Sequence, residues 1–385
     1  MSRLDELIAE LCPDGVEYVK LSSICDIKRG ERVTKSQLIE DGIYPVFSGG
    51  VSPMGYFNKF NREENTITIA QYGTAGYVNW IDEKFWANDV CYSLFPKEVI
   101  NKRYLYFVLV NLQDYIYTLR IDAVPAHLPV DRLGNIKIPL PPLAVQQEIV
   151  RILDNFTELT AELTAELTAR RKQYEYYRDL LLTFGDSVEY KPLGVVCDYV
   201  DYRGKTPRKV DVGIFLITAK NIRKGFIDYN ISREYIAVED YEQVMKRGKP
   251  NVGDVLITTE APCGNVAQLD RDDIALAQRV IKYRGKKGVI NNSYLKYVLL
   301  GTEFQMKLLR AATGGTVKGI KGSILHKLTI PVPPIEEQER IVAILDRFDA
   351  LCNDLTSGIP AEIEARQKQY EYYRDKLLSF KEVTA

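Results

Sequence analysis

Two segments of the chain carry apolar residues at the alternating three- and four-residue spacing of a coiled-coil seam. The first seam begins at Ile149 and ends at Phe184, and the second begins at Ile341 and ends at Phe380. A repeat of about 3.5 positions keeps one face of a helix turned toward a partner helix. Both segments are therefore predicted to be long helices of a coiled coil.

The second helix differs from the first by one inserted turn. Pro333 follows its counterpart Pro141 by 192 residues, and the matching separation rises to 196 later in the helices. The extra residues lie around Gly358 and Pro360. Proline removes a backbone donor and clashes with the preceding turn, so we expect this helix to be kinked or interrupted here.

The remaining segments alternate short β-rich runs with helical ones. Residues 65–78 and 253–266 are rich in β-branched side chains and end near a glycine, Gly76 in one and Gly264 in the other. This pattern is typical of strands. Helical runs follow at residues 103–116 and 293–309, so each region is predicted to be a globular α/β (α+β) domain.

The whole chain is a tandem duplication. The octapeptide KQYEYYRD occurs twice, at residues 172–179 and 368–375, and residues 141–156 match residues 333–348. A duplicated protein usually handles a bipartite partner. The repeated blocks predict a first globular domain at 1–145, a first helix at 146–184, a second globular domain at 185–335 and a second helix at 336–385.

The amino-terminal residues fit into this repeat. The sequence CPDGVEY at residues 12–18 matches FGDSVEY at residues 184–190. The predicted helix at residues 3–11 therefore stands where one of the long helices would end. The chain resembles a closed ring that is cut at this point.

Charge is unevenly divided between the two globular regions. Residues 185–335 hold 24 Lys and Arg against 16 Asp and Glu, a net charge of +8, whereas residues 1–145 hold 15 against 18, a net charge of −3. The cations of the second region stand beside glycine in four clusters, at residues 201–209, 219–225, 245–249 and 313–322. Glycine next to a cation lets backbone and side chain approach phosphate together, which makes nucleic acid a candidate partner. A single cluster of this kind is more often a solvated surface, and four in one domain favour nucleic acid.

The sequence carries little trace of a catalytic, cofactor or metal site. Its six cysteines include no C-x-x-C pair and it has only two histidines, which argues against a zinc site and a disulfide framework. Neither an ATP-binding G-x-x-x-x-G-K-[ST] loop nor an amino-methyltransferase motif is present. No apolar run reaches the about 18 residues of a membrane-spanning helix, and no signal peptide is evident. We therefore expect a cytoplasmic, non-catalytic protein without cofactor, metal or membrane partner.

The order of the motifs resembles the specificity subunit of type I restriction-modification enzymes. An IPxPPxxxQ motif followed by IxxxLD and QYEYYRD occurs in both halves, beginning at Ile138 and at Ile330. The resemblance covers essentially the whole chain. It implies two target recognition domains that each read one half of a split, asymmetric site in double-stranded DNA. It also implies that an antiparallel coiled coil spaces these domains and docks two methyltransferase subunits, and that restriction (translocase) subunits join through the complex.

Candidate DNA contacts are the polar and cationic residues of the loops. Arg and Lys suit phosphate or guanine, and Asn and Gln suit adenine. In the first domain, whose negative charge conflicts with a simple basic patch, the candidates are Arg29, Arg32, Lys35, Gln71, Tyr72 and Asn88. In the second domain they are Arg203, Lys205, Arg208, Lys220, Asn221, Arg223, Lys224, Gln278, Arg279, Lys318 and Lys321.

A short tandem repeat, TAELTAEL at residues 160–167, interrupts the first seam. Periodicity alone allows a solvated, alanine-rich helix without a special role. The family resemblance instead implies a spacer, marked by Thr160, Leu163, Thr164 and Leu167. Four residues add about 6 Å of length and about 40° of rotation to a helix. The repeat number would therefore change the separation of whatever is attached to the helix ends.

Two alternatives remain open. One is a scaffold that does not bind DNA and uses its duplicated modules to hold two proteins. The other is a fused restriction-methylation enzyme, which the missing motifs and the short chain disfavour.

Overall fold

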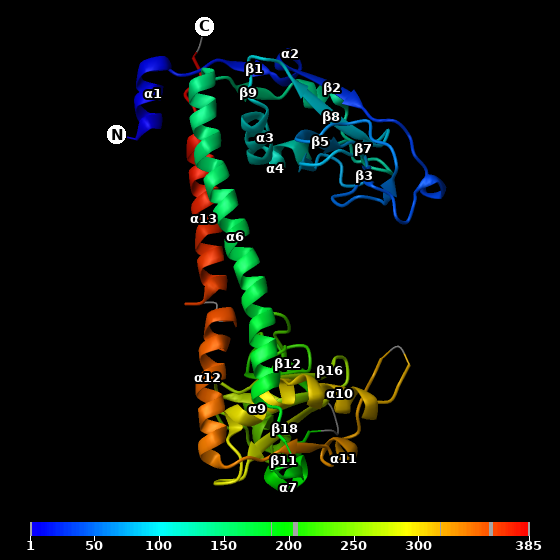
Figure 1. The fold of residues 1–385 in the computed structure, drawn as a ribbon, viewed down its shortest axis with the longest axis vertical. Coiled ribbons are helices and arrows are strands. Elements are labelled where there is room, and N and C mark those ends of the chain that lie inside the picture. Colours follow the sequence, from blue (N-terminus) through cyan, green and yellow to red (C-terminus); the bar gives the residue numbers. More distant parts are fainter. Residues whose placement is uncertain (1, 186, 203–206, 316, 354–356, 384–385) are drawn as a thin grey trace. The chain divides into compact units, whose positions relative to one another are not determined.

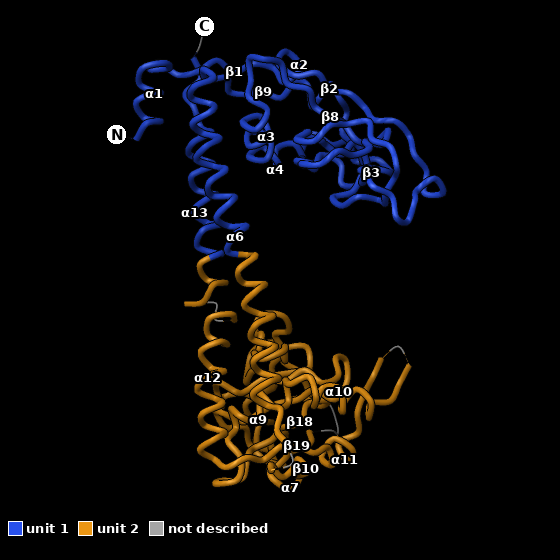
Figure 2. Tube along the Cα trace, in the orientation of Figure 1, with its two compact units in different colours: residues 1–163, 363–385 blue, residues 164–362 orange. Residues whose placement is uncertain are grey.

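The computed structural model describes residues 2–185, 187–202, 207–315, 317–353 and 357–383. The chain divides into two compact units (Figure 2). The first unit contains residues 1–163 and 363–385, and the second unit contains residues 164–362. Each unit thus combines one globular domain with part of both long helical segments. None of the described helices is long and apolar enough to cross a membrane.

The first domain is built on a four-stranded antiparallel sheet in the order β2-β8-β5-β6 (Figure 1). A smaller sheet has the order β4-β3-β7, and β1 pairs with β9. The strands are β1 (Tyr18–Lys20), β2 (Cys25–Arg29), β3 (Tyr44–Phe47), β4 (Tyr56–Phe57), β5 (Thr66–Ala70), β6 (Val78–Ile81), β7 (Trp86–Ala87), β8 (Cys91–Pro96) and β9 (Lys137–Pro139). The helices are α2 (Leu21–Ile24), the 3₁₀ turn η1 (Lys35–Gln37), α3 (Lys102–Asn111), α4 (Gln113–Thr118) and α5 (Val130–Gly134).

The second domain repeats this arrangement. Its main antiparallel sheet has the order β11-β18-β15-β16, its second sheet the order β12-β14-β13-β17, and β10 pairs with β19. The strands are β10 (Tyr190–Pro192), β11 (Cys197–Asp201), β12 (Lys209–Val210), β13 (Ile214–Ile217), β14 (Tyr235–Ile236), β15 (Val255–Thr259), β16 (Cys263–Gln268), β17 (Ile274–Leu276), β18 (Val280–Gly285) and β19 (Thr329–Pro331). The helices are α7 (Leu193–Val196), η2 (Val238–Asp240), α8 (Tyr241–Val244), α9 (Asn292–Leu300), α10 (Thr302–Ala311) and α11 (Gly322–Leu325).

The predicted mixed α/β class is therefore confirmed in both domains. The β-rich runs contain the central strands β5 and β15, all of whose residues are buried. The two helical runs each form a pair of helices, α3 with α4 and α9 with α10. A central strand is covered on both faces, which explains why these runs read as continuous apolar and β-branched segments.

The long helices are α6 (Leu143–Leu181), α12 (Ile335–Asn353) and α13 (Ile359–Leu377). The predicted interruption of the second helical segment is confirmed, because α12 ends before Gly358 and α13 begins after it. Every predicted seam residue of α6 except Tyr177 is buried or half-buried. The heptad pattern thus identified the packed face of this helix.

Each unit pairs α6 with one of the other two helices. In the first unit the ring of Phe156 stacks on Tyr373 of α13, with centroids 5.5 Å apart. In the second unit Tyr177 stacks on Phe348 of α12 at 5.7 Å. There Arg171 also donates to the carbonyl of Cys352, so α12 runs antiparallel to α6.

The glutamine of the IPxPPxxxQ motif joins each domain to the helix that follows it. Oε1 of Gln146 accepts the N–H of Asn101 at 2.7 Å, and its Nε2 donates to the carbonyl of Pro141 at 2.8 Å. Gln338 repeats both contacts, with Asn291 at 2.8 Å and Pro333 at 2.8 Å. Both glutamines are fully buried, so the motif satisfies backbone groups that would otherwise lack partners.

The end of the chain lies against the start of the first domain, as the ring-like repeat predicted. Helix α1 (Arg3–Leu11) has the predicted bounds. The N–H of Val16 donates to the carbonyl of Lys381 at 2.9 Å, and the N–H of Val383 donates to the carbonyl of Val16 at 3.0 Å. The hydroxyl of Tyr18 adds a bond to the carbonyl of Phe380 at 3.0 Å.

Candidate nucleic-acid interface

The loops of the two domains form equivalent backbone hydrogen bonds but carry different side chains. The carbonyl of Gln71, directly after β5, accepts the N–H of Leu128, and the carbonyl of Thr259, the last residue of β15, accepts the N–H of Ile320, both at 2.9 Å. The bridge beside these contacts joins Tyr72 to His127 in the first domain. In the second domain the equivalent bridge joins Glu260 to Gly319. A common scaffold therefore presents different chemistry at matching places.

The guanidinium of Arg29 lies over the buried ring of Tyr92, 5.9 Å from the ring centroid. Burial raises the pKa of the Tyr92 hydroxyl, which donates to the carbonyl of Leu128 at 3.2 Å, and the neighbouring Arg29 lowers this pKa. Tyr72 also stacks on His127 with ring centroids 5.5 Å apart. Sequence reasoning missed His127, although its rarity was a usable signal, since the chain has only two histidines.

Arg32, Lys35 and Asn88, the remaining candidates of the first domain, occupy two different environments. Arg32 and Lys35 are exposed on the segment that follows β2, and Arg29, the last residue of β2, is exposed as well. Asn88, by contrast, is only 5% exposed, and its side-chain amide is bonded to the backbone of Val33. Asn88 thus lies beneath the cationic segment rather than beside its side chains.

In the second domain Lys220, Gln278 and Arg279 line one open hollow of about 310 Å³. Lys209 and Thr218 line it too, and sequence reasoning did not select them. Thr218 directly follows β13, which pairs with β17 and so lies beside the segment that carries Gln278 and Arg279, whereas Lys209 comes from β12. The hollow therefore combines three cations with hydroxyl and amide groups and with Glu234, whose carboxylate pairs with Lys209 at 2.7 Å. Cations, hydroxyls and amides suit a phosphate or a base edge.

Arg279 has an unusual backbone at the edge of this hollow. Its φ is +72°, in the left-handed region that favours glycine. Its guanidinium lies 3.3 Å from a carboxylate oxygen of Glu260. Glu260 also forms the bridge to Gly319, next to the candidate Lys318.

The remaining candidates of the second domain do not line the hollow. Asn221 is fully buried, where its amide bonds Thr218, Asp228 and Ser232. Arg223 and Lys224 lie on a hairpin whose Gly225 N–H bonds the carbonyl of Val266 in β16. The side chains of Arg208 and Lys321 are exposed. Arg203 and Lys205 lie outside the described residues.

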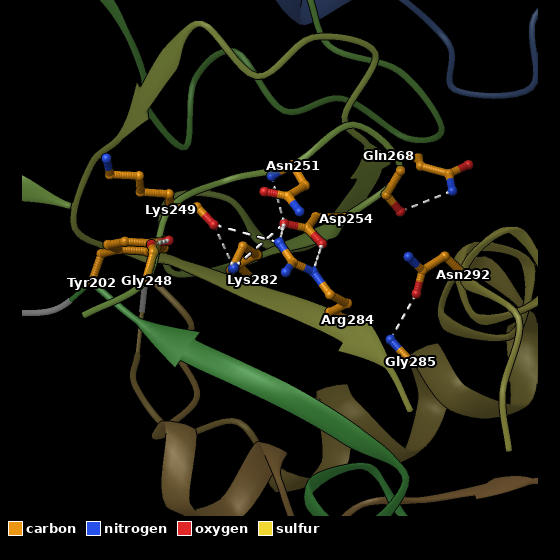
Figure 3. Close-up of polar contacts among 11 residues, drawn as sticks. Tyr202, Gly248, Lys249, Asn251, Asp254, Gln268, Lys282, Arg284, Gly285 and Asn292 are labelled. Atoms are coloured by element: carbon orange, nitrogen blue, oxygen red, sulfur yellow. Dashed lines mark hydrogen bonds and ion pairs between the residues drawn. The ribbon is translucent and has the colours of Figure 1, made fainter. Parts of the chain in front are cut away.

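A buried ionic cluster supports one of the basic loops (Figure 3). The carboxylate of Asp254 accepts two bonds from Arg284, at 2.6 and 2.8 Å, and lies 3.4 Å from Nζ of Lys282. Lys282 donates to the carbonyl of Lys249 at 2.9 Å, and Tyr202 donates to the carbonyl of Gly248 at 2.6 Å. Burial lowers the pKa of Lys282, against the opposing effect of Asp254. The cluster therefore ties the loop at residues 245–251 to the main sheet.

The type I restriction modification DNA specificity domain matches this chain twice, at residues 13–170 and 186–365. The chain belongs to this family. The two matched regions each contain one globular domain and part of the long helical segments. The duplication seen in the sequence is thus a duplication of one specificity domain.

Two curated relatives match this specificity-family chain over at least 95% of its length. A putative type I restriction enzyme specificity subunit of Haemophilus influenzae is 33% identical over 95% of this chain and 96% of its own. The EcoR124I/EcoR124II specificity subunit of Escherichia coli is 36% identical over 99% of this chain and 97% of its own. The crystal structure of a type I restriction-modification S subunit from M. genitalium has the same fold, with a TM-score of 0.60, 18% identity and coverage of 96% of this chain and 98% of that chain.

The TAEL repeat of this family member lies within α6. Leu163 and Leu167 are half-buried on the packed face, and the hydroxyl of Thr160 bonds the carbonyl of Phe156 at 2.8 Å. The division between the two compact units falls between Leu163 and Thr164, inside the repeat.

Proposed function

We propose that this chain is the DNA-reading subunit of a type I restriction-modification complex and that it recognises one asymmetric, bipartite sequence in double-stranded DNA. The observation that carries the proposal is one specificity domain present twice with different loop side chains. The bridge of Tyr72 with His127 in one domain and of Glu260 with Gly319 in the other illustrates this difference. Two copies of one scaffold with unlike loops suit two unlike half-sites.

Contact with DNA is assigned to the exposed cations of the two loop regions. In the first domain these are Arg29, Arg32 and Lys35, which concentrate positive charge on one segment of a domain whose net charge is negative. In the second domain the contact is centred on the hollow around Lys220 and Arg279. Because these cations bind DNA phosphates in this proposal, the affinity for DNA is expected to fall as the salt concentration rises.

Two methyltransferase subunits are the proposed protein partners, one for each unit. The repeated octapeptide leaves a tyrosine strongly exposed in both units, Tyr176 at 64% and Tyr372 at 62%. Large exposed aromatic side chains are typical of protein interfaces. Restriction subunits join through the same complex. The chain itself acts in the cytoplasm and contributes recognition rather than catalysis.

Mapping of methylated bases tests the recognition proposal. Cells that carry this chain and its methyltransferase are expected to methylate one bipartite, asymmetric motif, and cells with the methyltransferase alone are expected to lack that methylation. Methylation without a shared bipartite motif would contradict the proposal. Unchanged methylation in the absence of this chain would favour the scaffold alternative.

Native mass spectrometry tests the proposed stoichiometry. One copy of this chain is expected to bind two methyltransferase subunits, and Tyr176→Ala or Tyr372→Ala is expected to weaken binding of one of them. Tyr115→Ala is a matched control, because Tyr115 is a 51% exposed tyrosine of the first domain outside the octapeptides. A complex that keeps both subunits in the double variant would place the docking surface elsewhere.

A further inference from the structure

The backbone of the cationic segment after β2 is bonded to the domain at six groups from Arg29 to Val33. The carbonyl of Arg29 accepts Nη2 of Arg62 at 2.7 Å, and the N–H of Gly30 donates to the carbonyl of Cys91 at 3.2 Å. The next residue, Glu31, donates its backbone N–H to the carbonyl of Ala87 at 2.9 Å. Its own backbone carbonyl accepts a hydrogen bond from Nε1 of Trp86 at 2.7 Å.

Asn88 completes this set of contacts at Val33. Its Oδ1 accepts the N–H of Val33 and its Nδ2 donates to the carbonyl of Val33, both at 3.0 Å. Val33 is 4% exposed, whereas Arg29, Glu31 and Arg32 on the same segment are exposed. The side chains that could reach DNA therefore project from a backbone that is fixed on both sides of Arg32.

The close approach of this segment to β7 depends on a glycine. A Cβ atom on Gly30 would lie 1.9 Å from the carbonyl oxygen of Ala87 and 2.5 Å from that of Asn88. No other residue type fits in that space without a shift of the backbone. The segment therefore lies directly against β7, which carries Trp86, and against Asn88, which follows β7.

The second domain holds the equivalent carbonyl with an arginine from a different position in the sequence. Arg29 and Asp201 are the last residues of the equivalent strands β2 and β11. The carbonyl of Asp201 accepts Nη1 of Arg247 at 2.9 Å, just as the carbonyl of Arg29 accepts Arg62. Arg62 precedes β5 by four residues and Arg247 precedes β15 by eight, so loops of different length supply the same contact.

We propose that Asn88, together with Trp86 and Arg62, is a positioning residue for recognition, and that it holds the segment from Arg29 to Lys35 in the conformation that binds DNA. The proposal rests on the proposed function and assigns the first domain's DNA contact to this segment. Both ends of the Asn88 amide are used on Val33, so its effect on DNA passes through the backbone. Fixing a loop before binding removes the entropic cost of ordering its side chains during binding.

The test uses the complete complex with its methyltransferase subunits and two DNA duplexes, one with the mapped site and one unrelated. Asn88→Ala is expected to weaken binding to the site about tenfold, with a smaller effect on unrelated DNA. The slope of log affinity against log salt should stay the same, because all cations remain. Arg32→Ala is expected to reduce that slope by about one, since it removes one phosphate contact.

The fluorescence of Trp86 reports directly on the contacts that hold the segment. The chain has only two tryptophans, so Trp80→Phe leaves Trp86 as the single emitter. Adding site DNA to this variant is expected to shift the Trp86 emission. Introducing Asn88→Ala is expected to shift the emission of the DNA-free protein, because Glu31 and Val33 are held from the same strand region.

Asn101→Ala is the matched control. Asn101 also accepts backbone N–H groups in the first domain, at Arg103 and Tyr104, but it caps α3 and bonds no part of the segment. Its removal is expected to lower stability without changing discrimination between the two duplexes. If Asn88→Ala prevents folding, Trp86→Phe carries the same binding test, because it removes the bond to Glu31 and keeps a ring.

Each outcome has a distinct meaning. A wild-type complex that does not discriminate would overturn the proposed function and this inference with it. If the wild-type complex discriminates between the two duplexes and Asn88→Ala discriminates equally well, the inference alone is overturned. Lost discrimination at a single base pair, with normal recognition elsewhere, would make Asn88 a base-reading residue and would also overturn it.

Discussion

Gln146 accepts the backbone N–H of Asn101 at 2.7 Å across the junction between the first domain and α6. Gln338 and Asn291 repeat this relationship in the second unit. The glutamine is the last residue of the motif that enters each long helix, and the asparagine caps the helix that packs on the main sheet. The motif therefore fixes where each domain joins its helix.

Gln146→Leu is expected to destabilise the first unit by about 3 kcal/mol, because it strips partners from buried backbone groups that each cost about 1 to 3 kcal/mol when unsatisfied. Gln338→Leu is expected to do the same in the second unit. Thermal denaturation measures both. Gln147→Leu is the control, since the neighbouring Gln147 is exposed. Equal melting temperatures for Gln146→Leu and Gln147→Leu would contradict the assigned role.

Arg279→Gly is expected to raise stability and lower DNA affinity together. Glycine relieves a left-handed backbone that costs a non-glycine residue about 1 to 2 kcal/mol, while the hollow loses one cation. Denaturation should show a gain of about 1 kcal/mol, and binding to the mapped site should weaken with a smaller salt dependence. Arg271→Gly is the control, because Arg271 is not among the residues with positive φ. Unchanged DNA affinity in Arg279→Gly would remove Arg279 from the interface.

Deletion of one TAEL copy is expected to shorten the gap between the two half-sites. The helix loses about 6 Å and about 40° of rotation. One base-pair step is about 3.4 Å, so length allows one or two base pairs and the rotation favours one. Insertion of a third copy should have the opposite effect. Mapping of methylated sites measures the spacing, and an unchanged gap between unchanged half-sites would show that the repeat is not the spacer.

Asp254→Asn is expected to destabilise the second unit by about 3 to 5 kcal/mol, because Lys282 and Arg284 would then share a buried site without a counter-charge. Urea denaturation measures the loss. Asp198→Asn is the control, since Asp198 is an exposed carboxylate that acts on the same two cations. If both variants unfold at the same urea concentration as the wild type, the cluster does not stabilise the basic loop.

The sequence by itself determined the features that repeat along the chain or depend on neighbouring residues. The heptad spacing identified the packed face of α6, and Gly358 with Pro360 located the interruption between α12 and α13. The duplicated motifs led to the family, and β-branched runs located the central strands. These signals are local, because helix and strand periodicity and proline geometry act within a few residues.

Only the tertiary structure decided which loop residues lie close together and which form hydrogen bonds to the backbone. Asn88 and Val33 are 55 residues apart, yet their pairing turns a candidate base reader into a support for the cationic segment. The hollow around Arg279 forms where β13 pairs with β17, two strands that are more than 50 residues apart in the sequence. Both depend on the register of strands from distant parts of the chain, which residue type and spacing do not encode because long-range pairing is set by packing of the whole sheet.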